Sequence, residues 1–203
     1  DRPVIISSEE LSTTYNRDEA VLLAQILKHR FNEIRLLAYV REPRSYMSSI
    51  FQQRLKTGRP DFDIDKLYPD YKRKFNKWIA AFGRESLEAV QFHRSCFRDA
   101  DLIADFAHRV GAHITDINRP IGMLNESFTA EASAILFAYR RDRGHPKNRT
   151  MTTQFNGRAM VYLRTFGSHN FEIDRQLCDA AIDRRSDDID FVETLMGSSF
   201  VHR

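Results

Sequence analysis

The sequence has few of the residues that form metal or disulfide sites. Its two cysteines, Cys96 and Cys178, stand far apart, without the short spacings of metal-binding or redox motifs. Its seven histidines do not cluster in the manner of metal ligands. This cysteine usage fits thiols in a reducing compartment, so the expected localisation is cytoplasmic. The sequence therefore predicts a protein without a resident metal.

Long apolar runs and a strong excess of one charge are also missing. No apolar run approaches the length of a transmembrane helix, and no secretory signal peptide is visible. The formal net charge of +3 is too small to indicate a nucleic-acid partner. With 203 residues, of which 42% are hydrophobic and 29% charged, the chain suits one globular domain with a sizeable core. We expect neither a membrane span nor a nucleic-acid partner.

A glycine-rich phosphate loop is the third absence. The eight glycines stand singly, and neither Gly-Lys-Thr nor Lys-Ser-Gly-Thr-Thr occurs. Any phosphate site within these residues must therefore rely on side chains and helix ends.

One stretch of the chain offers such a site. The apolar run Leu36–Val40 predicts a strand buried on both faces. Arg41 follows it directly, and Pro43 suits the first position of a helix that Gly58 would end. The pattern thus predicts an arginine at the carboxyl end of a strand, beside a helix N-terminus.

The predicted helix also carries a polar stripe. Ser45, Ser49 and Gln52 follow one another at spacings of four and three residues, which places them on one face. Hydroxyls, an arginine and a helix N-terminus together favour a bound phosphate. The alternative is an arginine that caps the strand and an ordinary solvated helix face.

This arrangement resembles a known motif. Arg41, Pro43 and Ser49, with the arginine and the serine eight residues apart, resemble the 3′-phosphate-binding motif of sulfotransferases that use 3′-phosphoadenosine 5′-phosphosulfate. The resemblance implies that Arg41 and Ser49 hold the 3′-phosphate of this co-substrate. It also implies transfer of a sulfonate group to a hydroxyl or amine of a small-molecule or glycan acceptor, without a metal.

A second strand end carries the candidate base. Val4–Ser7 reads as a buried strand, which places Ser8 and Glu9 at its carboxyl end. The cytosolic members of the family have a histidine as general base at this place, and Ser-Ser-Glu resembles a bacterial branch. The resemblance therefore puts Glu9 in the position of the catalytic base. The alternative is that Glu9 caps a loop or the next helix.

A basic run marks the last candidate segment. Arg140–Arg149 is dense in arginine and lysine and contains Gly144 and Pro146, so we expect a loop. In sulfotransferases, a late basic loop with glycine covers the 3′-phosphate and the adenine, which implies donor binding by Arg143 and Gly144. The alternative is a solvated basic turn.

The rest of the pattern predicts an α/β fold. We expect three layers, with helices on both faces of a central parallel sheet as in P-loop proteins, and one domain over residues 1–203. Residues from about 150 to 203 form a helical extension of it, and Arg59–Asp70 a loop or lid. The expected elements are the strands named above, a strand at Leu87–Phe92, and helices at Asn16–Phe31, Tyr71–Phe82, Asp101–Val110, about 129–141, 156–166, 174–184 and 188–196.

Two other functions fit the same pattern. A nucleotide-dependent kinase would need an acidic residue at a strand end to hold Mg²⁺, a role that Glu9 could fill. A non-catalytic binding module could keep the fold without the chemistry. We further expect an upstream segment of roughly 30–80 residues that supplies a central strand and the phosphate loop.

Overall fold

A computed structural model describes residues 4–8, 10–112, 127–143 and 160–201 of the chain. These residues divide between two compact units. Unit 1 comprises Asp1–Val40, Asp70–Phe97 and Arg185–Arg203, and unit 2 comprises Arg41–Pro69 and Arg98–Arg184.

Unit 1 contains a parallel pair of strands. Strand β1 spans Leu36–Val40, strand β2 spans Leu87–Gln91, and their register runs from Leu36 opposite Leu87 to Val40 opposite Gln91. Two of the three predicted strands are therefore present, although β2 ends at Gln91 and not at Phe92, and the mixed α/β class is confirmed. Within the described residues the sheet has two strands, which is fewer than a central sheet between two helical layers requires.

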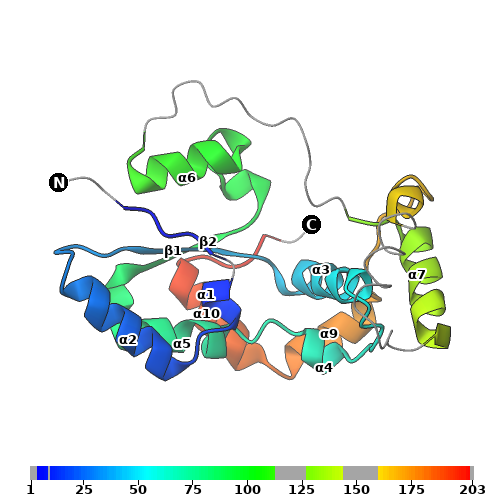
Figure 1. Ribbon diagram of the computed structural model, residues 1–203, viewed down its shortest axis with the longest axis horizontal. Coiled ribbons are helices and arrows are strands. Elements are labelled where there is room, and N and C mark those ends of the chain that lie inside the picture. The colour runs from blue at the N-terminus through cyan, green and yellow to red at the C-terminus, as the bar shows by residue number, and fades with distance from the viewer. Residues whose placement is uncertain (1–3, 9, 113–126, 144–159, 202–203) are drawn as a thin grey trace. The chain divides into compact units, whose positions relative to one another are not determined.

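Helices of unit 1 cover one face of this pair. They are α1 (Glu10–Thr13), α2 (Arg17–Lys28), α5 (Tyr71–Phe82) and α10 (Ser186–Met196). Figure 1 shows α2, α5 and α10 on the same side of β1 and β2. One core cluster joins the strands to α5 and α10, and another joins α2 to α5. Because strand side chains alternate, Leu87 and Ala89 of β2 point into the first cluster while Glu88 between them is only half-buried.

Helix α5 shows how local signals set the bounds of an element. The side chain of Asp70 accepts a hydrogen bond from the backbone of Arg73 and so caps the helix N-terminus. Gly83 ends the helix with φ of +96°, a conformation that glycine adopts without strain. The bounds Tyr71–Phe82 are those predicted. In α2, Asn16 and Glu19 form a reciprocal capping box, which confirms the predicted start of that helix.

The first predicted strand is wrong. Val4–Ser7 forms no strand, and the side chains of Val4, Ile5 and Ile6 are 62%, 55% and 60% exposed. A strand needs a neighbour for its backbone hydrogen bonds, and the described sheet holds β1 and β2 alone. For the same reason β1 is half-buried except at Val40, and is not buried on both faces as predicted.

Unit 2 is helical in its described residues. Its helices are α3 (Pro43–Lys56), α4 (Ile64–Leu67), α6 (Leu102–Val110), α7 (Ala130–Arg143) and α9 (Arg175–Asp183), and residues 160–164 are also helical. Three short 3₁₀ turns, η1 (Arg84–Ser86) and η2 (Arg94–Cys96) in unit 1 and η3 (Arg98–Ala100) in unit 2, connect elements. Helix α3 packs against α4, α7 and α9. The ring of Phe51 on α3 contacts those of Phe62, Phe137 and Phe171, so aromatic contacts contribute to this core.

Two predictions in unit 2 need correction. The segment Arg59–Asp70 contains α4, because Asp63 caps a helical turn by accepting hydrogen bonds from two backbone amides. Helix α7 extends to Arg143, so the first residues of the predicted basic loop are helical, and 144–149 lie outside the described residues.

Helix α6 follows the cap residue Asp101 as predicted, and its most buried side chain is a charged one. Asp105 is 2% exposed, whereas the apolar Ile103 is 41% exposed. The carboxylate of Asp105 accepts hydrogen bonds from the backbone of Arg98 and from the side chain of Arg109, which compensates for its burial. A search of the described helices for a segment with the length and apolarity to cross a bilayer finds none.

Candidate functional site

Arg41 and Ser49 both belong to unit 2. Arg41 follows the last residue of β1 in the chain, and Ser49 is the seventh residue of α3. Both residues are half-buried. The predicted geometry of an arginine at a strand end, followed by a helix that begins with Pro43, is therefore present.

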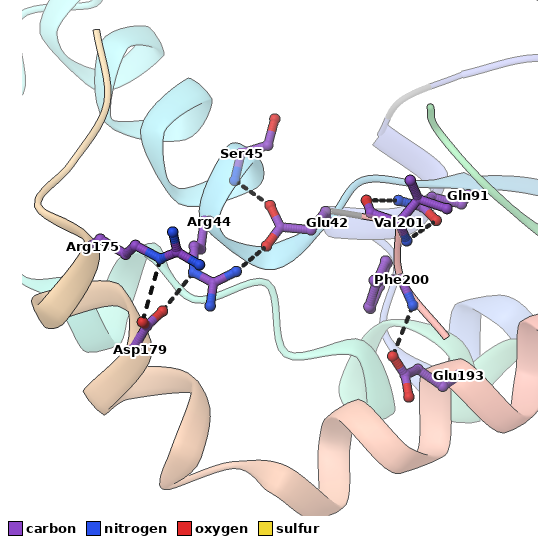
Figure 2. Close-up of polar contacts among 9 residues, drawn as sticks. All are labelled: Glu42, Arg44, Ser45, Gln91, Arg175, Asp179, Glu193, Phe200 and Val201. Atoms are coloured by element: carbon purple, nitrogen blue, oxygen red, sulfur yellow. Dashed lines mark hydrogen bonds and ion pairs between the residues drawn. The ribbon is translucent and has the colours of Figure 1, made fainter. Parts of the chain in front are cut away.

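The N-terminus of α3 already holds a carboxylate. Oε2 of Glu42 accepts a hydrogen bond of 2.8 Å from the backbone amide of Ser45, as Figure 2 shows. Glu42 thus caps the helix and places its negative charge where the helix dipole favours an anion. The Ser45 amide is therefore engaged by Glu42, and the phosphate site expected beside this helix end stays a prediction.

A charge network continues from Glu42 to α9. Nε of Arg44 donates a hydrogen bond of 2.5 Å to Asp179, and Nη1 of Arg44 lies 3.4 Å from Oε1 of Glu42 (Figure 2). The hydrogen bond to Asp179 raises the pKa of Arg44 above its usual value. Arg175 lies 3.8 Å from the same Asp179. Arg44 is therefore held between two carboxylates and orients Glu42.

The neighbouring thiol is not reactive. Cys178 on α9 is buried, and burial, with a smaller contribution from Asp179, raises its pKa to about 11. A thiol with so high a pKa is almost entirely protonated at neutral pH and is a poor nucleophile. We assign it a packing role.

The polar stripe of α3 binds other parts of unit 2. Gln52 is buried, its Nε2 donates to the carbonyl of Phe128 at 2.7 Å, and its Oε1 accepts from the amide of Phe128 at 3.2 Å. Nε2 of Gln52 also lies 3.2 Å from Oγ of Ser133. The side chain of Gln52 therefore pairs with both the amide and the carbonyl of Phe128, as a neighbouring strand would. It thereby holds α3 against the start of α7. At this position the face is not solvated.

The polar stripe of α3 continues to Lys56, a residue that the sequence analysis did not single out. The ammonium of Lys56 lies 4.7 Å from the centroid of the Phe128 ring, within the range of a cation–π contact. Burial, and to a smaller extent the charge of Arg164, lower the pKa of Lys56. The spacing of seven residues from Ser49 to Lys56 was the signal in the sequence, since it equals about two helical turns.

The side chains of three predicted site residues lie outside the part of the chain that the structure describes. Glu9 and Gly144 lie outside the described residues, and so does the side chain of Arg143, whose backbone ends α7. The structure therefore brings Arg41 and Ser49 into one unit and leaves the predicted base and basic loop as predictions.

In unit 1, the carboxyl end of β2 is occupied by the chain's own C-terminal segment. The buried side chain of Gln91 donates to the carbonyl of Val201 at 2.7 Å and accepts from its amide at 2.8 Å (Figure 2). The amide of Phe200 donates to Glu193 at 2.8 Å, and its ring lies beside that of Tyr71. The contact between Gln91 and Val201 links residues 110 positions apart, so no local sequence signal could reveal it.

Comparisons with known proteins give no family. No family model, curated protein or solved structure matches this chain. Within the described ranges, no three side chains of His, Cys, Asp or Glu gather in a way that could hold a metal ion.

Proposed function

We propose that this protein transfers a sulfonate group from 3′-phosphoadenosine 5′-phosphosulfate to a hydroxyl or amine of an acceptor. The observation that carries the proposal is the placement of Arg41, directly after a strand of a parallel pair and eight residues before Ser49 on α3. A guanidinium remains charged at all relevant pH values and can donate two parallel hydrogen bonds to a phosphate. A serine hydroxyl adds a neutral donor.

Two residues at this place can donate hydrogen bonds to a phosphate, and one carboxylate opposes its binding. Arg41 and Ser49 supply a charged and a neutral donor, and both are half-buried, so water screens their interactions less than at the surface. The carboxylate of Glu42 opposes the binding of a second anion at the helix end. We therefore propose that Arg41 and Ser49, and not the α3 amides, bind the 3′-phosphate.

The proposed chemistry assigns further roles to the chain. When bound, the co-substrate supplies an activated sulfonate group. Glu9 would accept the proton of the acceptor, and Arg143 and Gly144 would contact the anionic donor. The proposal also includes the finer architecture, in which β1 and β2 belong to a larger central sheet with helices on both faces. Its support is the parallel pairing of β1 and β2 and the helical layer on one face.

Calorimetric binding of two nucleotides tests the proposal. The ligands are 3′-phosphoadenosine 5′-phosphate, which is the product nucleotide, and adenosine 5′-phosphate, which lacks the 3′-phosphate. A hydrogen bond to a charged group is worth roughly 1.5–3 kcal/mol, or about one to two decades in affinity. Arg41→Ala and Ser49→Ala should each weaken the first ligand and leave the second unchanged.

The matched control is Arg59→Ala, which removes an exposed arginine of the same unit. It should change neither affinity. Equal weakening of both nucleotides by Arg41→Ala would refute the assignment of the 3′-phosphate. Selective nucleotide binding without sulfonate transfer to any acceptor would instead support a non-catalytic binding module.

A further inference from the structure

The segment Gly197–Val201, which we call the C-terminal strap, lies against the carboxyl end of β2 in unit 1. Gly197 ends α10 with φ of +72°, and four residues later the backbone of Val201 meets the side chain of Gln91, the last residue of β2. In open α/β sheets, ligands bind outside the carboxyl ends of the strands. The strap therefore occupies a place in unit 1 where a ligand would be expected.

Phe200 anchors the strap in the core. It is 6% exposed, and its ring centroid lies 6.0 Å from that of Tyr71. Its amide donates a hydrogen bond of 2.8 Å to Oε1 of Glu193, and Oγ of Ser199 donates one of 3.1 Å to Oε2 of the same carboxylate (Figure 2). Release of Phe200 would return buried apolar surface to water, so this part of the strap is fixed.

Val201 is held differently, although it is the next residue. It is 42% exposed, and its backbone makes two hydrogen bonds to the side chain of Gln91, at 2.7 and 2.8 Å (Figure 2). Water can replace such bonds at modest cost once it reaches the groups. Val201 can therefore leave Gln91 while Phe200 stays in the core.

The thiol of Cys96 lies beside the same contact. Oε1 of Gln91, which accepts from the amide of Val201, also lies 3.9 Å from Sγ of Cys96, and Cys96 is half-buried. A movement of Val201 away from Gln91 therefore changes the surroundings of this thiol. Cys178, the other cysteine of the chain, is buried and has a pKa of about 11, so it reacts slowly with thiol reagents.

We propose that Val201 is a latch on Gln91, and that its release opens the carboxyl end of β2 and the thiol of Cys96 to molecules from solution. Phe200 keeps the rest of the strap in place during this opening. The coupling is reciprocal, so a molecule that occupies this place favours the released latch. The inference concerns unit 1 and does not depend on the proposed sulfonate transfer.

The rate of thiol labelling tests the latch. N-ethylmaleimide is added to the protein, and mass spectrometry of peptides separates Cys96 from Cys178. A chain that ends at Phe200 lacks the latch and should label Cys96 about tenfold faster, because two hydrogen bonds that favour the closed state are gone. A chain that ends at Val201 keeps the latch and is the matched control, which should label at the rate of the complete chain. Equal rates in the two shortened chains would overturn the proposal.

Thermal unfolding separates the latch from the anchor. Loss of the residues after Phe200 should leave the midpoint nearly unchanged, whereas Phe200→Ala should lower it clearly, because it removes a ring from the core. An equal fall in both variants would show that Val201 is part of the core and would overturn a separate latch.

Hydrogen exchange by NMR in the complete chain tests the same division and the reciprocity. The amide of Val201 should exchange faster than that of Phe200, because the Phe200 amide opens only when the core does. After Cys96 is labelled, exchange at Val201 should accelerate further while exchange at Phe200 stays constant. Identical exchange rates at the two amides, or an unchanged rate at Val201 after labelling, would contradict the latch.

Discussion

The carboxylate of Glu42 accepts a hydrogen bond from the backbone amide of Ser45, two residues beyond Pro43 at the start of α3 (Figure 2). This contact places a negative charge at the helix N-terminus beside which the sequence pattern predicted a bound phosphate. Arg44 contacts the Glu42 carboxylate and is itself bound to Asp179, so Glu42 belongs to a network of ion pairs within unit 2.

Glu42→Gln should raise the affinity for anions at this helix end. The amide side chain keeps a hydrogen-bond acceptor for Ser45 but removes the charge that repels a phosphate. We expect tighter binding of 3′-phosphoadenosine 5′-phosphate by calorimetry and a loss of helix stability of about 1 kcal/mol or less. Glu172→Gln, at an exposed glutamate of the same unit, is the control. Weaker nucleotide binding in Glu42→Gln would show that Glu42 assists the ligand.

Asp188→Ala should destabilise unit 1 far more than the adjacent Asp187→Ala. The buried carboxylate of Asp188 accepts hydrogen bonds from the backbone amides of Tyr71 and Lys72 at 2.9 and 2.6 Å, at the start of α5. Its removal leaves a buried amide without its acceptor, which costs roughly 1–3 kcal/mol. Asp187 pairs with Lys72 at the exposed surface, where such pairs contribute little.

Urea unfolding followed by circular dichroism measures both aspartate variants. The midpoint should fall clearly for Asp188→Ala and hardly for Asp187→Ala, with similar slopes. Equal midpoints for the two variants would mean that water replaces the carboxylate at the α5 N-terminus.

His169 and Glu131 should tie the segment after residues 160–164 to α7 in a pH-dependent way. Nδ1 of His169 lies 2.6 Å from Oε1 of Glu131, and the amide of Ala130 donates to the His169 carbonyl at 2.9 Å. The hydrogen bond from His169 lowers the pKa of Glu131 from 4.5 to about 2, and the same bond raises the pKa of His169 above 6.5.

The sign of the pH effect follows from these two shifts. The histidine contribution is complete below pH 6.5 and is lost as pH rises through the raised pKa of His169. The glutamate contribution is complete above pH 4.5 and is lost as pH falls toward about 2. The contact is therefore strongest between about pH 4.5 and 6.5. NMR titration should give a His169 pKa above 6.5 that returns toward 6.5 in Glu131→Gln, and an unchanged pKa in that variant would contradict the pairing.

Local signals in the sequence were sufficient for most of the helices. Helix α5 has the predicted bounds because Asp70 and Gly83, the residues that cap and end it, are next to it in the chain. The same holds for α6 between Asp101 and Gly111. The positions of β1 and β2 were predicted from two runs of strand length, whereas the direct pairing of β1 with β2 was not predicted.

The site was predicted only in part, because its controlling contacts are distant in sequence. Arg41 and Ser49 lie where their spacing indicated, but the spacing did not show that Glu42 would turn back onto the Ser45 amide. Nor did it show that Gln52 would bind Phe128, 76 residues later, and thereby place an aromatic ring under Lys56. Each of these contacts satisfies a buried or partly buried polar group.

The sequence by itself determined where helices such as α5 begin and end, since caps, glycines and apolar periods act over a few residues. The tertiary structure decided which faces are buried. Val4–Ile6 is as apolar as a strand but is exposed, because burial requires a neighbouring strand. Asp105 is charged but buried, because Arg109 and the Arg98 amide compensate its carboxylate. Burial depends on the partners that an element meets, and those partners come from distant parts of the chain.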